Sequence, residues 1–193
     1  MEVEEAQYLA ARILTKLLTD NGINHAFLGG FALRTLEHNR KTDNIDIEVD
    51  VLAGEQPRHN LIQLILVSDS RFSVDSLGRL FFTPSGAPEL HVLVETLPVG
   101  SLNLPKNLAT ISPGEGPVPI LPPGILVLTK IKRLSSIIDS TRPKSVQKAA
   151  RDTADVMFLL KWLARNEEHI DFMGYEAEIP ERLYTATAFV AQT

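Results

Sequence analysis

Residues 27–50 read FLGGFALRTLEHNRKTDNIDIEVD and combine three features in a fixed order. An apolar run ends in Gly29-Gly30, a helical segment follows, and alternating polar and apolar residues come last. Side chains two apart on a strand point to the same face. The apolar members can therefore enter a core, while the polar members present oxygen atoms to a cation on the opposite face. The apolar set is Ile45, Ile47, Val49 and Val51, and the polar set is Asn44, Asp46, Glu48 and Asp50.

The glycine pair joins a strand expected over Ile23 to Leu28 to a helix expected over Phe31 to His38. The N-terminus of that helix would direct free backbone N–H groups and the positive end of the helix dipole toward a phosphate. Glycine would let the phosphate approach the backbone closely. A Gly-Gly pair is also typical of an ordinary strand-to-helix turn, and an acidic strand face is often only solvated. The combination of the two features, in this order, is more specific than either feature.

This stretch resembles the opening of the nucleotidyltransferase fold, the DNA polymerase beta-like superfamily. There a strand ends in Gly-Gly or Gly-Ser, a helix follows, and the next strand carries an Asp-x-Asp or Asp-x-Glu pair that holds divalent metal on a nucleoside triphosphate. Residues 40–47 lie over the family's Arg-x-Thr-x-Asp-x-Asp-apolar pattern. The resemblance implies that metal is held by Asn44, Asp46 and Glu48, and that the triphosphate is contacted by Gly29, Gly30, Arg40 and Thr42.

The first metal position departs from the family pattern, because Asn44 stands where the family has an aspartate. An alternative register takes Asp46 and Glu48 as the carboxylate pair. An amide offers one carbonyl oxygen and no negative charge, so it is a weaker ligand for Mg²⁺. The site is therefore weakened, shifted to the Asp46 and Glu48 register, or used for other chemistry.

The third acid of the family comes from a strand that we expect over Glu89 to Glu95. His91 falls at that position, and Glu89 and Glu95 are alternatives. Imidazole is a poor ligand for Mg²⁺. His91 could instead be a general base or a surface histidine.

The last third of the sequence predicts a pair of helices, over Gly124 to Ile138 and over Lys144 to Arg165. This pair resembles the minimal and AbiEii-like branch of the family, which has a Lys on the first helix and a Lys/Arg-Asp-x-x-Asp pattern on the second. Lys130 and residues 151–155, RDTAD, fit those positions. The resemblance implies that Lys130 meets a phosphate. The alternative is a structural salt bridge from Lys130 to Asp152 or Asp155.

Composition limits the class of protein. The 193 residues include 44% hydrophobic residues and no cysteine, which predicts one domain without disulfides or thiolate metal sites. A net charge of −5 gives no electrostatic case for general nucleic-acid binding. The acidic start MEVEEAQ and the lack of a long apolar run indicate neither a signal peptide nor a membrane span. We therefore expect a cytoplasmic protein.

The expected fold class is α/β (α+β), with a small mixed β-sheet of the nucleotidyltransferase type flanked by helices and a C-terminal helical pair. A single domain would cover residues 1–193, with a sheet-containing core to about residue 120, helices over about 121–170 and a tail over 171–193. Further elements are expected over Glu4 to Thr19, Pro57 to Val67, Arg71 to Asp75 and Arg79 to Thr83, and a loop over Val99 to Pro123. Leu183, Tyr184, Phe189 and Val190 in the tail could dock on the domain or on a second subunit.

The leading functional hypothesis is Mg²⁺-dependent transfer of a nucleoside monophosphate from a nucleoside triphosphate to a small-molecule or protein hydroxyl. One alternative is a metal-independent enzyme that acts on small molecules and uses Asp46, Glu48 and His91 as acid-base groups. Another is a non-catalytic module that binds a protein partner, such as a regulator or one half of a toxin-antitoxin-like pair. The protein could also form a homo-oligomer.

Overall fold

The computed structural model describes residues 1–50, 57–100, 109–113, 116–137, 139–170, 181, 185, 187–188 and 190. The chain forms two compact units. The first comprises Met1–Ser101 and Lys106–Leu121, and the second comprises Leu102–Pro105 and Pro122–Thr193. The expectations for Val51, Ile138, Leu183, Tyr184 and Phe189 lie outside the described residues.

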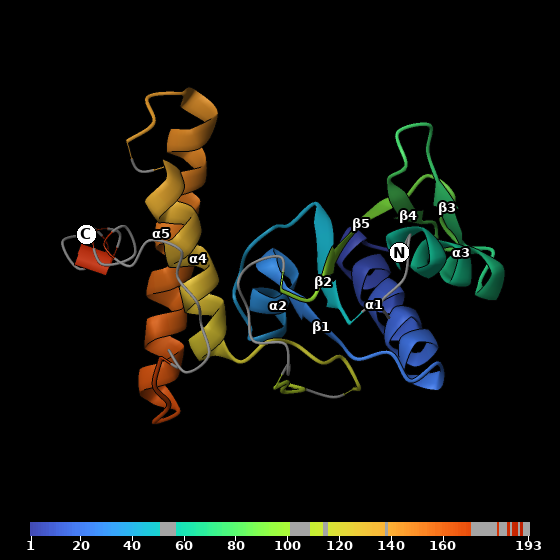
Figure 1. The fold of residues 1–193 in the computed structure, drawn as a ribbon, viewed down its shortest axis with the longest axis horizontal. Coiled ribbons are helices and arrows are strands. Elements are labelled where there is room, and N and C mark those ends of the chain that lie inside the picture. The colour runs from blue at the N-terminus through green and yellow to red at the C-terminus, as the bar shows by residue number, and fades with distance from the viewer. Residues whose placement is uncertain are drawn as a thin grey trace. The chain divides into compact units, whose positions relative to one another are not determined.

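The first unit contains a five-stranded sheet with helices (Figure 1). The strand order is β1-β2-β5-β4-β3, in which β2 and β5 run parallel and the other neighbours run antiparallel. This mixed sheet confirms the expected fold class. The elements are α1 Val3–Asp20, β1 His25–Leu28, α2 Gly29–Thr35, β2 Asn44–Val49, α3 Pro57–Ser68, β3 Phe72–Val74, β4 Leu80–Phe82 and β5 Val92–Pro98.

Helix α1 packs against β2 and β5. It begins with a capping box, in which the Glu5 side chain accepts a hydrogen bond from the Glu2 backbone N–H at 3.0 Å. Its core-facing stripe repeats at helical spacing through Gln7, Ala11, Leu14 and Leu18, all of which are buried. Gln7 is the polar member of this stripe.

The core of the first unit is aliphatic and aromatic. Phe27 on β1 and Phe31 on α2 meet edge to face with ring centroids 5.4 Å apart, and Phe72 and Phe82 pack at 5.1 Å on β3 and β4. Such aromatic pairs add about 0.5–1.5 kcal/mol each beyond the burial of their area. The alternate residues Ile45, Ile47 and Val49 of β2 are also buried, as the alternation predicts. Asn44, Asp46 and Glu48 therefore lie on the other face of β2.

Strand β5 differs from the expected strand over Glu89 to Glu95, because it begins and ends three residues later, at Val92–Pro98. A turn closed by the Leu90 N–H and the Ala87 carbonyl precedes it. Its first residue, Val92, pairs with Phe82 of β4, and six consecutive pairings with β2 follow, from Asn44 opposite Leu93 to Val49 opposite Pro98. Local sequence does not reveal such non-local pairings.

The second unit contains two helices that pack on each other, α4 Pro123–Ile137 and α5 Pro143–Arg165. Proline at the first position of α5 suits a helix start, because its missing N–H would have no partner inside the helix. Buried apolar residues lie on both helices, including Ile131 and Leu134 on α4 and Val156, Leu159 and Leu163 on α5. Within the described part of the chain, the helices are all too short or too polar to cross a bilayer.

Candidate functional site

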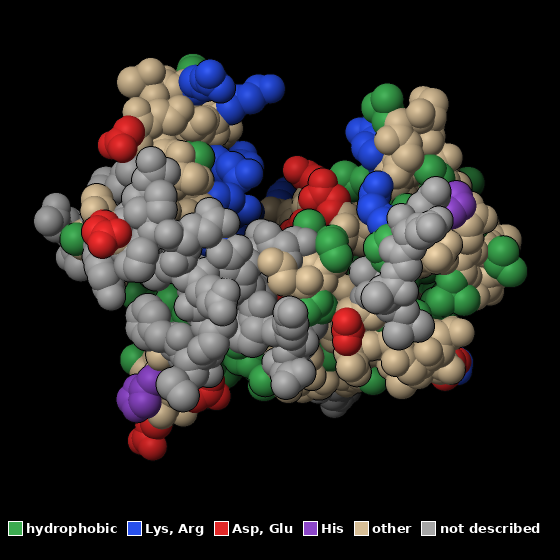
Figure 2. All heavy atoms as spheres, viewed as in Figure 1, with side chains coloured by type: hydrophobic (Ala, Val, Ile, Leu, Met, Phe, Trp, Pro, Cys, Tyr) green, Lys and Arg blue, Asp and Glu red, His purple; other side chains and the backbone are tan. Residues whose placement is uncertain are grey.

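Two acidic side chains from neighbouring strands meet at a polar cluster in the first unit. Asp46 on β2 lies directly opposite Glu95 on β5 in the parallel register. Asn44 joins them, because its Nδ2 donates to Asp46 Oδ1 at 3.0 Å and to Glu95 Oε2 at 2.7 Å. We call Asn44, Asp46 and Glu95 the acid cluster. Figure 2 shows acidic side chains gathered at the surface where Figure 1 places β2.

The glycine pair allows β2 side chains to approach the start of α2. A Cβ atom on Gly29 would lie 1.9 Å from Asp46 Oδ2. Gly29 also has a φ angle of +68°, which residues with a side chain rarely adopt. A Cβ atom on Gly30 would lie 2.8 Å from Thr42 Oγ1 and 3.4 Å from the guanidinium carbon of Arg40. The structure therefore brings Gly29, Gly30, Arg40 and Thr42 together beside Asp46.

Thr42 connects the start of α2 to the acid cluster. Its Oγ1 donates to the Asn44 carbonyl at 3.2 Å and lies 3.4 Å from Asn44 Oδ1. Its own carbonyl accepts a hydrogen bond from Gln7 Nε2 at 2.8 Å. The role of Gln7 was not expected from the sequence, although a polar residue on the apolar stripe of α1 is a signal that could have indicated one.

Glu48 lies on the same face of β2 as Asp46 but is fully buried. The Gly100 N–H donates to Glu48 Oε1 at 3.0 Å, and Oε2 has no hydrogen-bond partner among the described residues. Burial disfavours the charged form and raises the pKa of Glu48 to about 7, while the hydrogen bond from Gly100 acts in the opposite direction. Glu48 can therefore hold a proton near neutral pH.

The donor set of the acid cluster suits a hard cation. Asp46 and Glu95 supply carboxylate oxygens, and the Asn44 amide can supply its carbonyl oxygen after rotating half a turn. In the described residues there is no group of three or more His, Cys, Asp or Glu side chains that could hold a metal ion. A cation bound at the acid cluster would therefore have two carboxylates and one amide as its protein ligands.

His91 lies outside the acid cluster. It precedes β5, is exposed, and its Nδ1 lies 2.9 Å from Thr83 Oγ1. Glu95 lies four positions further along the chain, which is about 13 Å when the chain is extended. Glu89 is also exposed, in the turn before the strand. Glu95, an alternative for the third acid, is the residue that the structure places opposite Asp46.

Lys130 lies in the second unit and is 2% exposed. Its Nζ is 2.8 Å from Asp155 Oδ2 and 3.6 Å from Asp152 Oδ1, and Arg133 forms a two-point ion pair with Asp152. Burial lowers the pKa of Lys130, although the Asp155 carboxylate opposes that effect. These contacts form the salt bridge that the alternative interpretation of Lys130 predicted, and they join α4 to α5.

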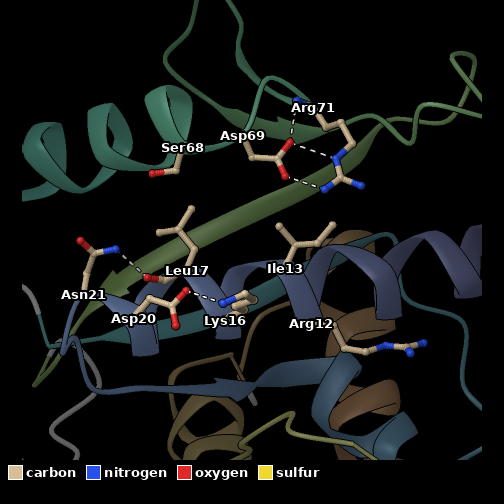
Figure 3. Close-up of a pocket in the computed structure, with 9 residues that line it drawn as sticks. All are labelled: Arg12, Ile13, Lys16, Leu17, Asp20, Asn21, Ser68, Asp69 and Arg71. Carbon is tan, nitrogen blue, oxygen red and sulfur yellow. Dashed lines mark hydrogen bonds and ion pairs between the residues drawn. The ribbon is translucent and has the colours of Figure 1, made fainter.

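A separate cavity of about 490 Å³ opens in the first unit between α1 and the segment after α3 (Figure 3). Ile13 and Leu17 of α1 are the apolar members of its lining. The charged residues include two ion pairs, Lys16 with Asp20 at 2.6 Å and Arg71 with Asp69 at 2.5 Å. The residues of the acid cluster do not line this cavity, so the two features are distinct.

Comparison with known proteins supports the fold. No protein-family model matches the sequence, and no curated protein does. A solved structure of an antigenic nucleotidyltransferase-like protein from Paracoccidioides brasiliensis superimposes with a TM-score of 0.74 at 19% identity, covering 97% of this chain and 88% of the other. A solution structure of the antibiotic-resistance factor ANT(2'')-Ia covers 100% of this chain and 94% of its own, at 12% identity and a TM-score of 0.47. The first match shows that this chain has the fold of a nucleotidyltransferase-like protein.

Proposed function

We propose that this chain is a nucleotidyltransferase-like protein that uses one divalent cation, with Mg²⁺ as the expected ion and a nucleoside triphosphate as substrate. The observation that carries the proposal is the pairing of Asp46 with Glu95 in register on adjacent parallel strands, beside the Gly29-Gly30 turn. The fold supports the proposal by analogy only, because one fold hosts many functions. The acceptor that we propose is a small-molecule or protein hydroxyl.

Each residue of the acid cluster has a distinct role in this proposal. Asp46 and Glu95 would hold the cation, and Asn44 would turn its carbonyl oxygen toward it. When bound, the cation would neutralise negative charge on the triphosphate and on the leaving pyrophosphate. Gly29 leaves room for the Asp46 carboxylate, because a Cβ atom at position 29 would collide with it. Glu48 is buried and its pKa is raised to about 7, so below that pH it would add no charge to the cluster.

A second candidate function is metal-independent chemistry or ligand binding at the same cluster. The observation that favours it is the position of the Asn44 amide, whose two N–H groups already bond both carboxylates. These two hydrogen bonds hold the carboxylates of Asp46 and Glu95 close together, and they require no metal ion. Under this alternative, Asp46 and Glu95 would bind or move protons on a small molecule.

Calorimetric titration separates the two candidates. The purified protein is titrated with ATP, GTP, CTP and UTP, each with and without Mg²⁺ or Mn²⁺. Nucleotide binding that requires metal and is lost in Asp46→Ala supports the first candidate. Absence of metal-dependent binding to the whole panel contradicts it.

A matched pair of variants tests the assignment of the third acid. Glu95→Gln keeps the size of the side chain and removes the charge opposite Asp46, so we expect it to weaken metal-dependent binding by about tenfold or more. Glu89→Gln makes the same chemical change in the exposed turn before β5 and should leave binding unchanged. Equal effects of the two substitutions on metal-dependent binding would show that Glu95 has no special role, although it pairs with Asp46 in the β2–β5 register.

A further inference from the structure

A chain of hydrogen bonds reaches the acid cluster from the core of the first unit. Gln7 is fully buried on α1, and its Nε2 donates to the Thr42 carbonyl at 2.8 Å. Its Oε1 accepts a hydrogen bond from Arg34 on α2 at 2.5 Å. We call Arg34, Gln7 and Thr42 the core relay. It joins α1, α2 and the segment that leads into β2.

The two partners of Gln7 fix the orientation of its amide. A guanidinium group only donates hydrogen bonds, and a backbone carbonyl only accepts them. The oxygen of Gln7 must therefore face Arg34, and the nitrogen must face Thr42. Exchanging the two atoms would place donor against donor and acceptor against acceptor.

Arg34 is itself held firmly. Its side chain is only 6% exposed, and it forms an ion pair with Glu4 at 2.9 Å. Its guanidinium carbon lies 5.8 Å from the centroid of the Tyr8 ring, and that ring packs on Phe31 at 5.2 Å. The relay thus begins at a cation that is packed against the core and fixed at two sides.

Thr42 links Gln7 to Asn44 through hydrogen bonds. The carbonyl of Thr42 accepts a hydrogen bond from Gln7, and the hydroxyl of Thr42 donates to the Asn44 carbonyl. The Cβ atom of Thr42 would lie 3.0 Å from a Cβ atom on Gly30, so Thr42 also lies close to the start of α2. Asn44 is two residues further along and places its amide between Asp46 and Glu95. A shift of Thr42 therefore moves the group that joins the two acids.

We propose that Gln7 is a positioning residue, which holds Thr42 and thereby sets the place of the Asn44 amide between Asp46 and Glu95. An apolar residue would satisfy the helical stripe of α1 at this position, and burying an amide without partners is unfavourable. The two hydrogen bonds of Gln7 explain why an amide can be buried at this position, and one of them, to the Thr42 carbonyl, connects Gln7 to the acid cluster. The expected effect of Gln7 on cation affinity, unlike its effect on Asn44, rests on the proposed function.

The key variant is Gln7→Glu. A carboxylate keeps the size of the side chain and still accepts from Arg34, but it has no hydrogen to donate to the Thr42 carbonyl. Gln7→Met removes both bonds and gives a second variant if the first does not fold. Thr15→Val is the matched control, because Thr15 is a buried polar residue on the same helix whose Oγ1 has no hydrogen-bond partner in the described structure.

The first measurement needs no ligand. The side-chain NH₂ signals of Asn44 in a ¹⁵N–¹H NMR spectrum, assigned by their loss in Asn44→Ala, report directly on the bonds to Asp46 and Glu95. We expect these signals to move in Gln7→Glu and to stay in place in Thr15→Val. Unchanged Asn44 signals in folded Gln7→Glu or Gln7→Met would overturn the proposal.

The second measurement titrates Mg²⁺ into the same proteins. We expect the affinity to fall by about tenfold or more in Gln7→Glu, as for other residues that orient a metal ligand, and to be unchanged in Thr15→Val. If the unsubstituted protein binds no Mg²⁺ while the Asn44 signals still move, the positioning role of Gln7 stands and the proposed function fails. If Mg²⁺ binds equally to all the variants, Gln7 does not set the affinity of the site, and the proposal is overturned in that part.

Discussion

Glu48 should make the stability of the metal-free protein depend on pH in a direction opposite to that of a typical surface carboxylate. Its pKa is raised from 4.5 to about 7 by burial. Between these two values the folded state holds a proton that the unfolded state has released, so the contribution of Glu48 to stability is largest below pH 4.5 and falls as the pH rises toward 7. At about 1.36 kcal/mol for each unit of pKa, the full effect is about 3 kcal/mol.

The test compares the unsubstituted protein with Glu48→Gln, which cannot titrate. Urea unfolding is followed by circular dichroism from pH 4.5 to 8 in the presence of a chelator. Tryptophan fluorescence would be unsuitable, because the single tryptophan, Trp162, lies on α5 in the second unit, whereas Glu48 lies in the first. The expected result is that the difference in unfolding free energy between the two proteins changes by about 3 kcal/mol across this range. The test rests on how this difference changes with pH and not on its absolute value. The glutamine amide places hydrogens where Oε2 lies, which changes stability by an amount that does not depend on pH.

Two further points make this measurement decisive. Burial lowers the pKa of His25, so that group makes stability fall as the pH drops below about 6.5, but it is present in both proteins and cancels in the difference. Glu89→Gln, which removes an exposed carboxyl group, is the control for loss of charge alone. Parallel pH profiles for the unsubstituted protein and Glu48→Gln would refute the conclusion that burial holds a proton on Glu48.

Three other substitutions have definite expected outcomes. Gly29→Ala should destabilise the fold by more than about 1 kcal/mol in urea unfolding, and by more than Gly78→Ala, because both glycines have positive φ but only a Cβ on Gly29 would collide with Asp46 in the described structure. Lys130→Met should cost about 3–5 kcal/mol, measured by Trp162 fluorescence in urea, because it removes the ammonium group that pairs with the buried Asp155 carboxylate; the exposed Lys148→Met on α5 should change little. Asn44→Asp should raise Mg²⁺ affinity in calorimetry and lower the melting temperature of the metal-free protein; a gain in both affinity and metal-free stability would contradict the role given to the amide.

The sequence predicted those parts of the site that depend on local pattern. The alternation over residues 44–49 gave the two faces of β2, and the glycine pair marked the turn that lies beside Asp46. Glu95 was less certain, because its place depends on where β5 begins and which β2 residue it meets. A shift of register moves every side chain along its partner strand, and local sequence does not specify that register.

The core relay was harder to foresee for a different reason. Gln7 and its acceptor, the Thr42 carbonyl, are 35 residues apart, and the helical pattern of α1 shows only that position 7 faces the core. Arg34 bonds Gln7 and Glu4 on α1. A buried polar residue must find partners, but the pattern that reveals its burial does not reveal which partners they are.

The presence of an amide rather than a carboxylate at position 44 has a physical consequence for the acid cluster. An aspartate at position 44 would place a third carboxylate beside Asp46 and Glu95, and like charges on neighbouring positions of a sheet repel one another. A bound cation would relieve this repulsion. The Asn44 amide instead donates one hydrogen bond to each acid, at 3.0 and 2.7 Å, and so holds them together without metal. The same bonds must break before the carbonyl oxygen of Asn44 can turn toward a cation. The chain is therefore expected to fold with an ordered acid cluster in the absence of metal and to bind a cation more weakly than a cluster of three carboxylates would.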